Sequence, residues 1–152
     1  MKHWLMKTEP EVFSIDDLKR LKISPWDGVR NYQARNFMMK EMAIGDAILL
    51  YHSNAEPPGV AGLARVASAA LPDKSQFAEK SEYFDPKATR EKPIWFAVTV
   101  AFKEKFPRLV SLAEIRAEPN LSEILVAKKG QRLSIQPVTA QEFAWVCQMA
   151  RA

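Results

Sequence analysis

A segment near the start of the chain, Pro25–Phe37, concentrates side chains that could bind another molecule. Trp26 offers a large flat ring on which a ligand could stack. Arg30 and Arg35 carry forked guanidinium groups that suit phosphate or carboxylate partners. Gly28 permits a tight turn before a predicted helix. The same residues also allow a structural interpretation, in which Trp26 fills the core and the arginines face solvent, and on residue types alone that interpretation is favoured.

A second group of polar side chains follows the apolar run 47–51, which predicts a central strand. His52, Ser53 and Asn54 come directly after this run, and Pro57–Gly59 then stiffens the connection. A plain loop is one interpretation. Three adjacent hydrogen-bonding side chains at a strand end also suit a binding loop.

Composition excludes several other kinds of site. The chain has 152 residues, one cysteine (Cys147) and two histidines (His3 and His52), so it forms no internal disulfide and has no set of residues at metal-ligand spacing. It also lacks a glycine-rich phosphate loop, and we expect no metal and no cofactor. No apolar run is long enough to cross a bilayer, so we expect a soluble, cytoplasmic protein. The net charge of +4 favours polyanionic partners.

Strands alternate with capped helices along the chain. Capping boxes predict helix starts at Ser14, Ser111 and Thr139, and Asn31 caps a helix predicted over 31–42. Strands are predicted over 4–7, 47–51, 59–69, 93–102 and 132–137, with residues 71–93 irregular. In the last strand Leu133 and Ile135 are expected to point inward, and Arg132, Ser134 and Gln136 outward. The pattern predicts an α+β fold, with a small, barrel-like, mixed or antiparallel sheet and helices packed on it.

Several multi-residue motifs resemble those of one known family, the EVE domain, and they follow its order over essentially the whole chain. They are Trp4–Pro10, Trp26–Asn36, Tyr51–Asn54 with Pro57–Gly59, Tyr83–Lys87, Lys105–Pro107 and Arg132–Pro137. One departure is Thr8, where the family usually has serine, and the hydroxyl is kept. The resemblance implies a single domain over residues 1–152 with a PUA-like fold, a curved mixed β-barrel flanked by helices.

The resemblance also implies a function, since EVE domains are linked to modified cytosine in DNA and related YTH domains to methylated adenine in RNA. We therefore expect a non-catalytic module that binds DNA or RNA and holds a modified base in an aromatic pocket. Modified cytosine is the base that the resemblance favours. The family's pocket motifs correspond here to Lys7, Thr8, Trp26, Asn31, Tyr51, His52, Ser53, Asn54, Gln136 and Pro137. Candidate contacts to the nucleic-acid backbone are Arg30, Arg35, Lys129 and Arg132.

Two alternatives stay open at this point. The first is an enzyme acting on a nucleotide or another small molecule in the same pocket, for which the candidate acids and bases are Lys7, Glu9, Asp27 and His52. The second is a structural or protein-binding module in which Trp26 only fills the core. For the base-binding module, we expect Trp26→Ala to abolish recognition without unfolding the chain.

Overall fold

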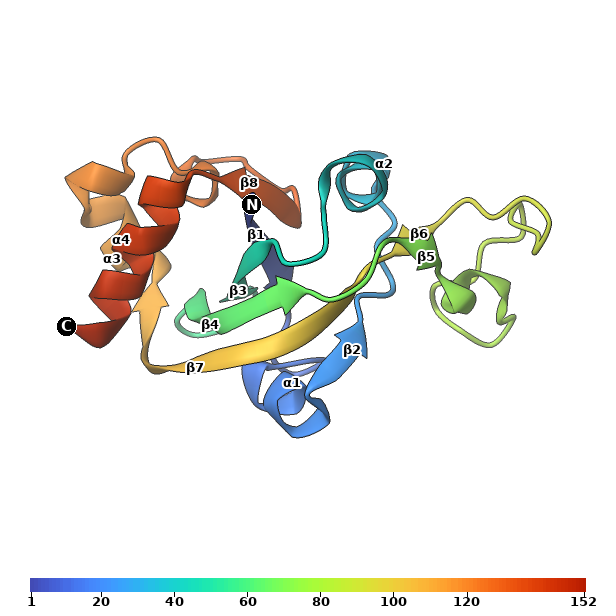
Figure 1. The fold of residues 1–152 in the computed structure, drawn as a ribbon, viewed down its shortest axis with the longest axis horizontal. Helices are drawn as coiled ribbons and strands as arrows, with labels where there is room; N and C mark the ends of the chain where they lie inside the picture. Colours follow the sequence, from blue (N-terminus) through green and yellow to red (C-terminus); the bar gives the residue numbers. More distant parts are fainter.

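The protein is built on a curved mixed β-sheet, seen in a computed structural model that describes residues 1–152 (Figure 1). The strands are β1 (His3–Thr8), β2 (Ile23–Pro25), β3 (Ala47–His52), β4 (Gly59–Val66), β5 (Leu71–Pro72), β6 (Phe96–Ala97), β7 (Thr99–Ser111) and β8 (Ile135–Val138). The helices are α1 (Ile15–Leu21), α2 (Tyr32–Asn36), α3 (Leu112–Ala117) and α4 (Ala140–Arg151). A π-helical turn covers Phe37–Glu41, and 3-10 turns cover Lys74–Phe77, Pro119–Leu121 and Leu125–Ala127. Six strands pair in the order β2-β7-β4-β3-β1-β8, which leaves β2 and β8 at the edges.

β3 is one of the two middle strands of the sheet, between β4 and β1, and it runs parallel to β1. Five of the six residues of β3 are buried, which confirms that the strand is covered on both faces. The parallel register places Lys7 beside Tyr51 and Thr8 beside His52. The C-terminal ends of both strands therefore lie side by side at the same end of the sheet, and the residues that follow the two strands start from there.

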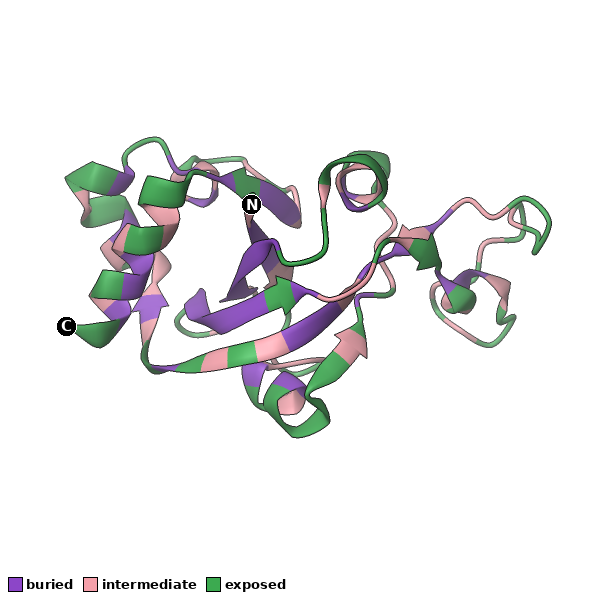
Figure 2. Ribbon diagram, in the orientation of Figure 1, coloured by how far each residue is buried: buried purple, intermediate pink, exposed green.

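Alternation along the central strands divides the core in two. Trp4 and Met6 of β1 face one hydrophobic cluster, which α1 and α2 cover. Leu5 of β1, with Leu49 and Tyr51 of β3, faces a second cluster, which α3 and α4 cover. Figure 2 shows the central strands buried and the outer surfaces of the helices exposed. Since each fully buried aliphatic or aromatic side chain contributes about 1.5–3 kcal/mol, the two clusters anchor both faces of the sheet.

The strand predicted over 93–102 is wrong in its bounds. The chain instead forms the short β6 and then β7, which has 13 residues and continues to Ser111. Lys103 and Lys105 hide this continuation in the sequence because they lie exposed on the outer side of the strand. The pairing of β7 with β4 shifts register twice, and such bulges bend strands. At Gly62 an added Cβ would lie within van der Waals overlap of the Glu104 carbonyl, so this close crossing needs glycine and helps to curl the sheet into a half-barrel.

The helix starts agree with the sequence more closely than the helix lengths do. Complete capping boxes are confirmed in Ser14–Asp17, Ser111–Glu114 and Thr139–Glu142. Asn31 caps α2, but the helix predicted over 31–42 changes to the π-helical turn after five residues. None of the helices is both long and apolar enough to cross a membrane.

Candidate functional site

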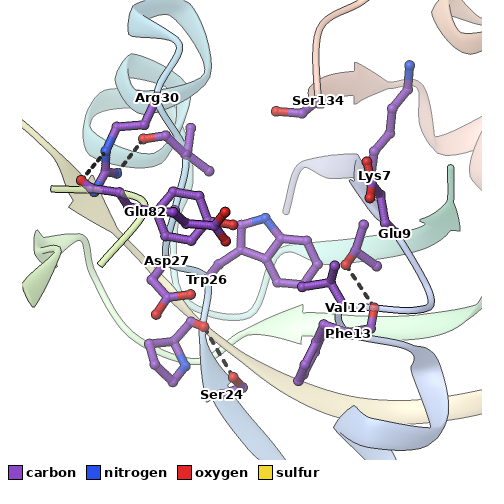
Figure 3. Close-up of a pocket in the computed structure, with 15 residues that line it drawn as sticks. Lys7, Glu9, Val12, Phe13, Ser24, Trp26, Asp27, Arg30, Glu82 and Ser134 are labelled. Carbon is purple, nitrogen blue, oxygen red and sulfur yellow. Dashed lines mark hydrogen bonds between the residues drawn. The ribbon is translucent and has the colours of Figure 1, made fainter. Parts of the chain in front are cut away.

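A cavity of about 650 Å³ opens where the end of β1 meets the segment that follows β2 (Figure 3). Its wall comes from five separate stretches of the chain, residues 7–9, 12–13, 24–30, 82–83 and 134. The volume lies within the range of about 300–1,000 Å³ that is typical of small-molecule sites. The wall combines apolar rings with hydroxyl, amine and carboxylate groups, so the cavity could hold a flat, partly polar ligand.

Trp26 is the central wall of this cavity, and it belongs to the core as well. The residue is only 7% exposed and packs in the cluster of α1 and α2. Its backbone N–H donates to the Val98 carbonyl at 2.9 Å, which continues the pairing of β2 with β7. The Phe13 ring meets the indole edge-on, with centroids 6.2 Å apart and planes at 89°. The ring is therefore held rigidly from behind while it lines the cavity (Figure 3).

Lys7 and Thr8, two of the predicted pocket residues, line the cavity from the end of β1. The Thr8 hydroxyl donates to the Phe13 carbonyl at 2.8 Å and so fixes the turn that carries Phe13. The Lys7 ammonium lies 3.5 Å from the Gln131 carbonyl, and burial lowers the pKa of this amine. Its interactions in the structure are this long hydrogen bond and a position 5.8 Å from the centre of the Tyr51 ring. Lys7 therefore lines the cavity, but its ammonium extends away from the Trp26 indole (Figure 3).

Three carboxylates also line the cavity: Glu9, Asp27 and Glu82. Glu9 accepts a hydrogen bond of 2.7 Å from the Asn54 amide. The Asp27 side chain keeps access to solvent. Even so, partial desolvation raises the pKa of its carboxyl, and the negative charge of Asp73 raises it further. The cavity is therefore rich in hydrogen-bond acceptors, which suits a ligand that presents amino groups.

Four of the predicted pocket residues do not line the cavity. Asn31 accepts a hydrogen bond from the Ala34 N–H at 2.9 Å as the cap of α2. Tyr51 is 3% exposed and belongs to the second core cluster. The Ser53 N–H donates to the Thr8 carbonyl at 2.9 Å. Asn54 lies outside the cavity and reaches it only through its hydrogen bond to Glu9.

The two predicted residues of β8 also lie outside the cavity, although Ser134 just before them is part of its wall. The expectation that Gln136 points outward is wrong. It is 1% exposed, and its amide donates to the Leu133 carbonyl at 2.8 Å, because both faces of β8 are covered at this position. Pro137 is exposed and pairs with Trp4 of β1.

The predicted backbone contacts divide into two pairs. The guanidinium groups of Arg30 and Arg35 bond to the protein itself, and that of Arg35 donates to the Ile94 carbonyl at 2.9 Å. Lys129 and Arg132 are exposed in the loop that precedes Ser134. These two remain accessible to a phosphate, and Lys7 is tied to the same loop through the Gln131 carbonyl.

Sequence reasoning missed the parts of the wall that other loops contribute, chiefly Val12, Phe13, Glu82, Tyr83 and Ser134. Tyr83 and Ser134 each belong to a motif of the family resemblance, Tyr83–Lys87 and Arg132–Pro137, and that was the available signal. No group of three or more histidine, cysteine, aspartate or glutamate side chains is arranged to hold a metal ion.

His52 is a support for α1. Its Nε2 accepts a hydrogen bond from the Ile15 N–H at 3.1 Å, which requires a neutral ring, and burial lowers its pKa below 6.5. A lowered histidine pKa contributes stability above the unfolded pKa that is lost as pH falls. We expect the free energy of unfolding to decrease by about 1 kcal/mol as pH falls from above the unfolded pKa of His52 to below its folded pKa. His52→Gln should remove that decrease, because the glutamine side-chain oxygen can accept the hydrogen bond from the Ile15 N–H and does not titrate. Urea unfolding at pH 7.5 and 5 checks this, and an equal decrease in both proteins would contradict it.

Comparison with known proteins agrees with the fold. A family model described as the EVE domain matches residues 2–149. Thymocyte nuclear protein 1 of Homo sapiens is 40% identical over 162 aligned residues, which cover 95% of this chain and 72% of that protein.

Solved structures are similar over the same length. The crystal structure of human THYN1 protein in complex with 5-methylcytosine-containing DNA has a TM-score of 0.91 and 39% identity, and the match covers 100% of this chain and 99% of that one. A crystal structure of a protein from Pseudomonas syringae has a TM-score of 0.93 and 42% identity, and the match covers 97% of this chain and 99% of that one. These likenesses confirm the curved, helix-flanked PUA-like sheet that the family resemblance implies. The chain belongs to the EVE domain family.

Proposed function

We propose that this protein is a nucleic-acid-binding module that holds a modified base, preferentially modified cytosine, in the cavity beside Trp26. The observation that carries the proposal is the human THYN1 structure, which is 39% identical over the full chain and is in complex with 5-methylcytosine-containing DNA. DNA is accordingly the partner that we favour, and RNA is an outcome of the test below.

The apolar part of the cavity supports the proposal. A base turned out of its stack can lie on the Trp26 indole, and such stacking contributes about 1–3 kcal/mol per base. A methyl group adds only about 0.8 kcal/mol on burial, so its recognition needs a closely fitting apolar wall. Val12 and Phe13 lie beside one end of the indole and can supply that wall (Figure 3).

The polar part of the cavity suits cytosine better than thymine, which carries the same methyl group. Cytosine presents an amino group where thymine presents a carbonyl oxygen. The Asp27 and Glu82 carboxylates in the wall accept hydrogen bonds, so they favour the amino group and oppose the carbonyl. Lys7 together with the exposed Lys129 and Arg132 provides positive charge for the adjoining phosphates.

The test is a titration of the protein with short oligonucleotides, as DNA and as RNA, at two salt concentrations. One base in each would be cytosine, 5-methylcytosine, 5-hydroxymethylcytosine, thymine or methylated adenine. We expect the modified cytosines to bind more tightly than cytosine, and thymine to bind weakly. Weak binding that is equal for all bases and is lost at the higher salt concentration would reduce the interaction to phosphate contacts and contradict the proposal.

The enzyme hypothesis keeps one specific observation in its favour, a half-buried lysine of lowered pKa in the lining of the cavity, Lys7. Lys7, Glu9 and Asp27 all line the cavity, whereas His52 does not. Turnover of a modified nucleoside that Lys7→Ala abolishes would support this second candidate. Chromatography of the nucleoside after incubation with the wild type decides between the two.

A further inference from the structure

The cavity wall contributed by Glu82 and Tyr83 belongs to a segment, residues 73–95, that has little regular structure but dense internal bonding. Gln76 is fully buried at its centre. Its amide donates to the Asp73 and Trp95 carbonyls at 2.8 and 2.7 Å, and its side-chain oxygen accepts the N–H groups of Ile94 and Trp95. The Trp95 indole donates to Asp85 at 2.8 Å. The segment is therefore a preformed unit that can be positioned as a whole.

Arg30 joins this unit to the cavity. Its Nε and Nη2 both donate to the Tyr83 carbonyl, at 3.0 and 2.7 Å, and Nη2 also donates to the Ser75 hydroxyl at 3.0 Å. Nη1 donates to the Val29 carbonyl at 2.8 Å and to the Asp73 carboxylate at 3.1 Å. A guanidinium has five N–H donors, and these five bonds use them all. Arg30 has no donor left for a phosphate.

Asp73 fixes Arg30 in turn. Its side chain is 1% exposed, and besides Arg30 it accepts the Gly28 N–H at 2.8 Å and the Ser75 N–H at 2.9 Å. One carboxylate thus ties the backbone after Trp26 to the start of the 73–95 segment. The Asp73 carboxylate is shielded from solvent and the Arg30 side chain is mostly so, and the several hydrogen bonds between them and their neighbours restrict the geometry of the pair.

Gly28 fixes the Tyr83 ring from the other side. It has a φ of +82°, and a Cβ at this position would lie 2.8 Å from the ring carbon Cζ of Tyr83. The ring therefore rests directly on the Gly28 backbone. The Arg30 guanidinium carbon lies 5.5 Å from the ring centroid. The hydrogen bonds from Arg30 to the Tyr83 carbonyl and the packing of the ring on Gly28 together restrict where the ring can lie in the cavity wall.

We propose that Arg30 is a positioning residue that acts through Tyr83, and that the Tyr83 ring so placed is a selective wall for the bound base. This inference rests on the proposed function. Residue type alone would indicate that Arg30 contacts a phosphate. The inference instead assigns Arg30 to selection of the base.

A double-mutant cycle tests the inference. Wild type, Arg30→Lys, Tyr83→Ala and the double variant are titrated with oligonucleotides carrying 5-methylcytosine or cytosine over a series of salt concentrations. Because Arg30→Lys keeps the charge and loses the fork, we expect the preference for 5-methylcytosine to fall on the order of tenfold, with the salt dependence unchanged. Adding Arg30→Lys to Tyr83→Ala should have no further effect. Arg116→Lys, in α3, is the matched control for the substitution.

Gly28→Ala is a second route to the same result, because it displaces the Tyr83 ring and leaves the Arg30 charge in place. It covers the case in which Arg30→Lys does not fold, which urea unfolding reveals. Additive effects of Arg30 and Tyr83, or Gly28→Ala with the full preference, would overturn the inference. Arg30→Ala with a salt slope reduced by about one would indicate a phosphate contact instead. A wild type without any preference between the two bases would reject the proposed function itself, which is a separate outcome.

Discussion

Replacing Trp26 with leucine is expected to weaken binding of 5-methylcytosine oligonucleotides by about 5- to 150-fold, because stacking contributes about 1–3 kcal/mol per base. Leucine keeps apolar volume against Phe13 and removes only the flat ring. Trp26→Phe restores a ring and should recover part of the loss. Fluorescence anisotropy with a labelled oligonucleotide measures both variants against the wild type.

The structure also changes which Trp26 variant is informative. Trp26 is 7% exposed within a core cluster of 15 residues, and truncating a buried tryptophan to alanine costs about 3–5 kcal/mol. The expectation that Trp26→Ala leaves the fold intact therefore does not follow from this packing. Trp145→Leu, on α4 in the other core, is the matched control and should bind normally. Wild-type affinity in Trp26→Leu would contradict the assignment of the cavity.

The largest effect on stability is expected for Asp73→Ala, at about 3–5 kcal/mol of the free energy of unfolding. The removal of Asp73 takes the counter-charge from Arg30, whose side chain is 22% exposed. It also takes the acceptor from the Gly28 and Ser75 N–H groups, at about 1–3 kcal/mol for each buried group left unsatisfied. Asp16→Asn is a useful contrast, because it removes a mostly exposed ion pair with Lys105 and should cost under about 1 kcal/mol. Urea unfolding at pH 7 measures both variants.

The same carboxylate predicts a pH dependence. Burial opposes ionisation of Asp73, but hydrogen bonds from Ser75, Gly28 and Arg30 outweigh burial and lower its pKa below 3.8. A lowered aspartate pKa contributes stability above the unfolded pKa, and that contribution is lost as pH falls through the folded pKa. The wild type should therefore lose stability below about pH 4, and Asp73→Asn should lose less over the same interval. Equal losses in both would show that other groups govern acid unfolding.

Local patterns predicted the elements well because the interactions concerned lie within a few residues. The Ser14–Asp17 box involves neighbours along the chain, and the apolar run of β3 specifies burial directly. β7 was predicted too short because Lys103 and Lys105 alternate outward on a strand whose inner side is packed by residues far away.

The cavity could be predicted only in part, for the same reason. Trp26, Lys7 and Thr8 were identified as wall residues from their motifs. Tyr83 and Ser134 also lie in motifs, but only long-range packing brings them to the wall. Arg30 shows the limit most clearly. Its type predicts a phosphate contact, but four of its five hydrogen bonds go to partners 43 to 53 residues away and the fifth goes to the adjacent Val29, so every donor is used.

The two edge strands of the sheet, β2 and β8, each contain a proline, Pro25 and Pro137. Proline has no N–H to donate to a neighbouring strand, and β2 has only three residues, so both edges are poor templates for strand pairing between molecules. If the proposed function holds and many copies bind along one densely methylated nucleic acid, their sheets are poorly suited to join edge to edge. The spacing of bound molecules would then follow the spacing of the marks themselves, and each copy could leave independently of its neighbours.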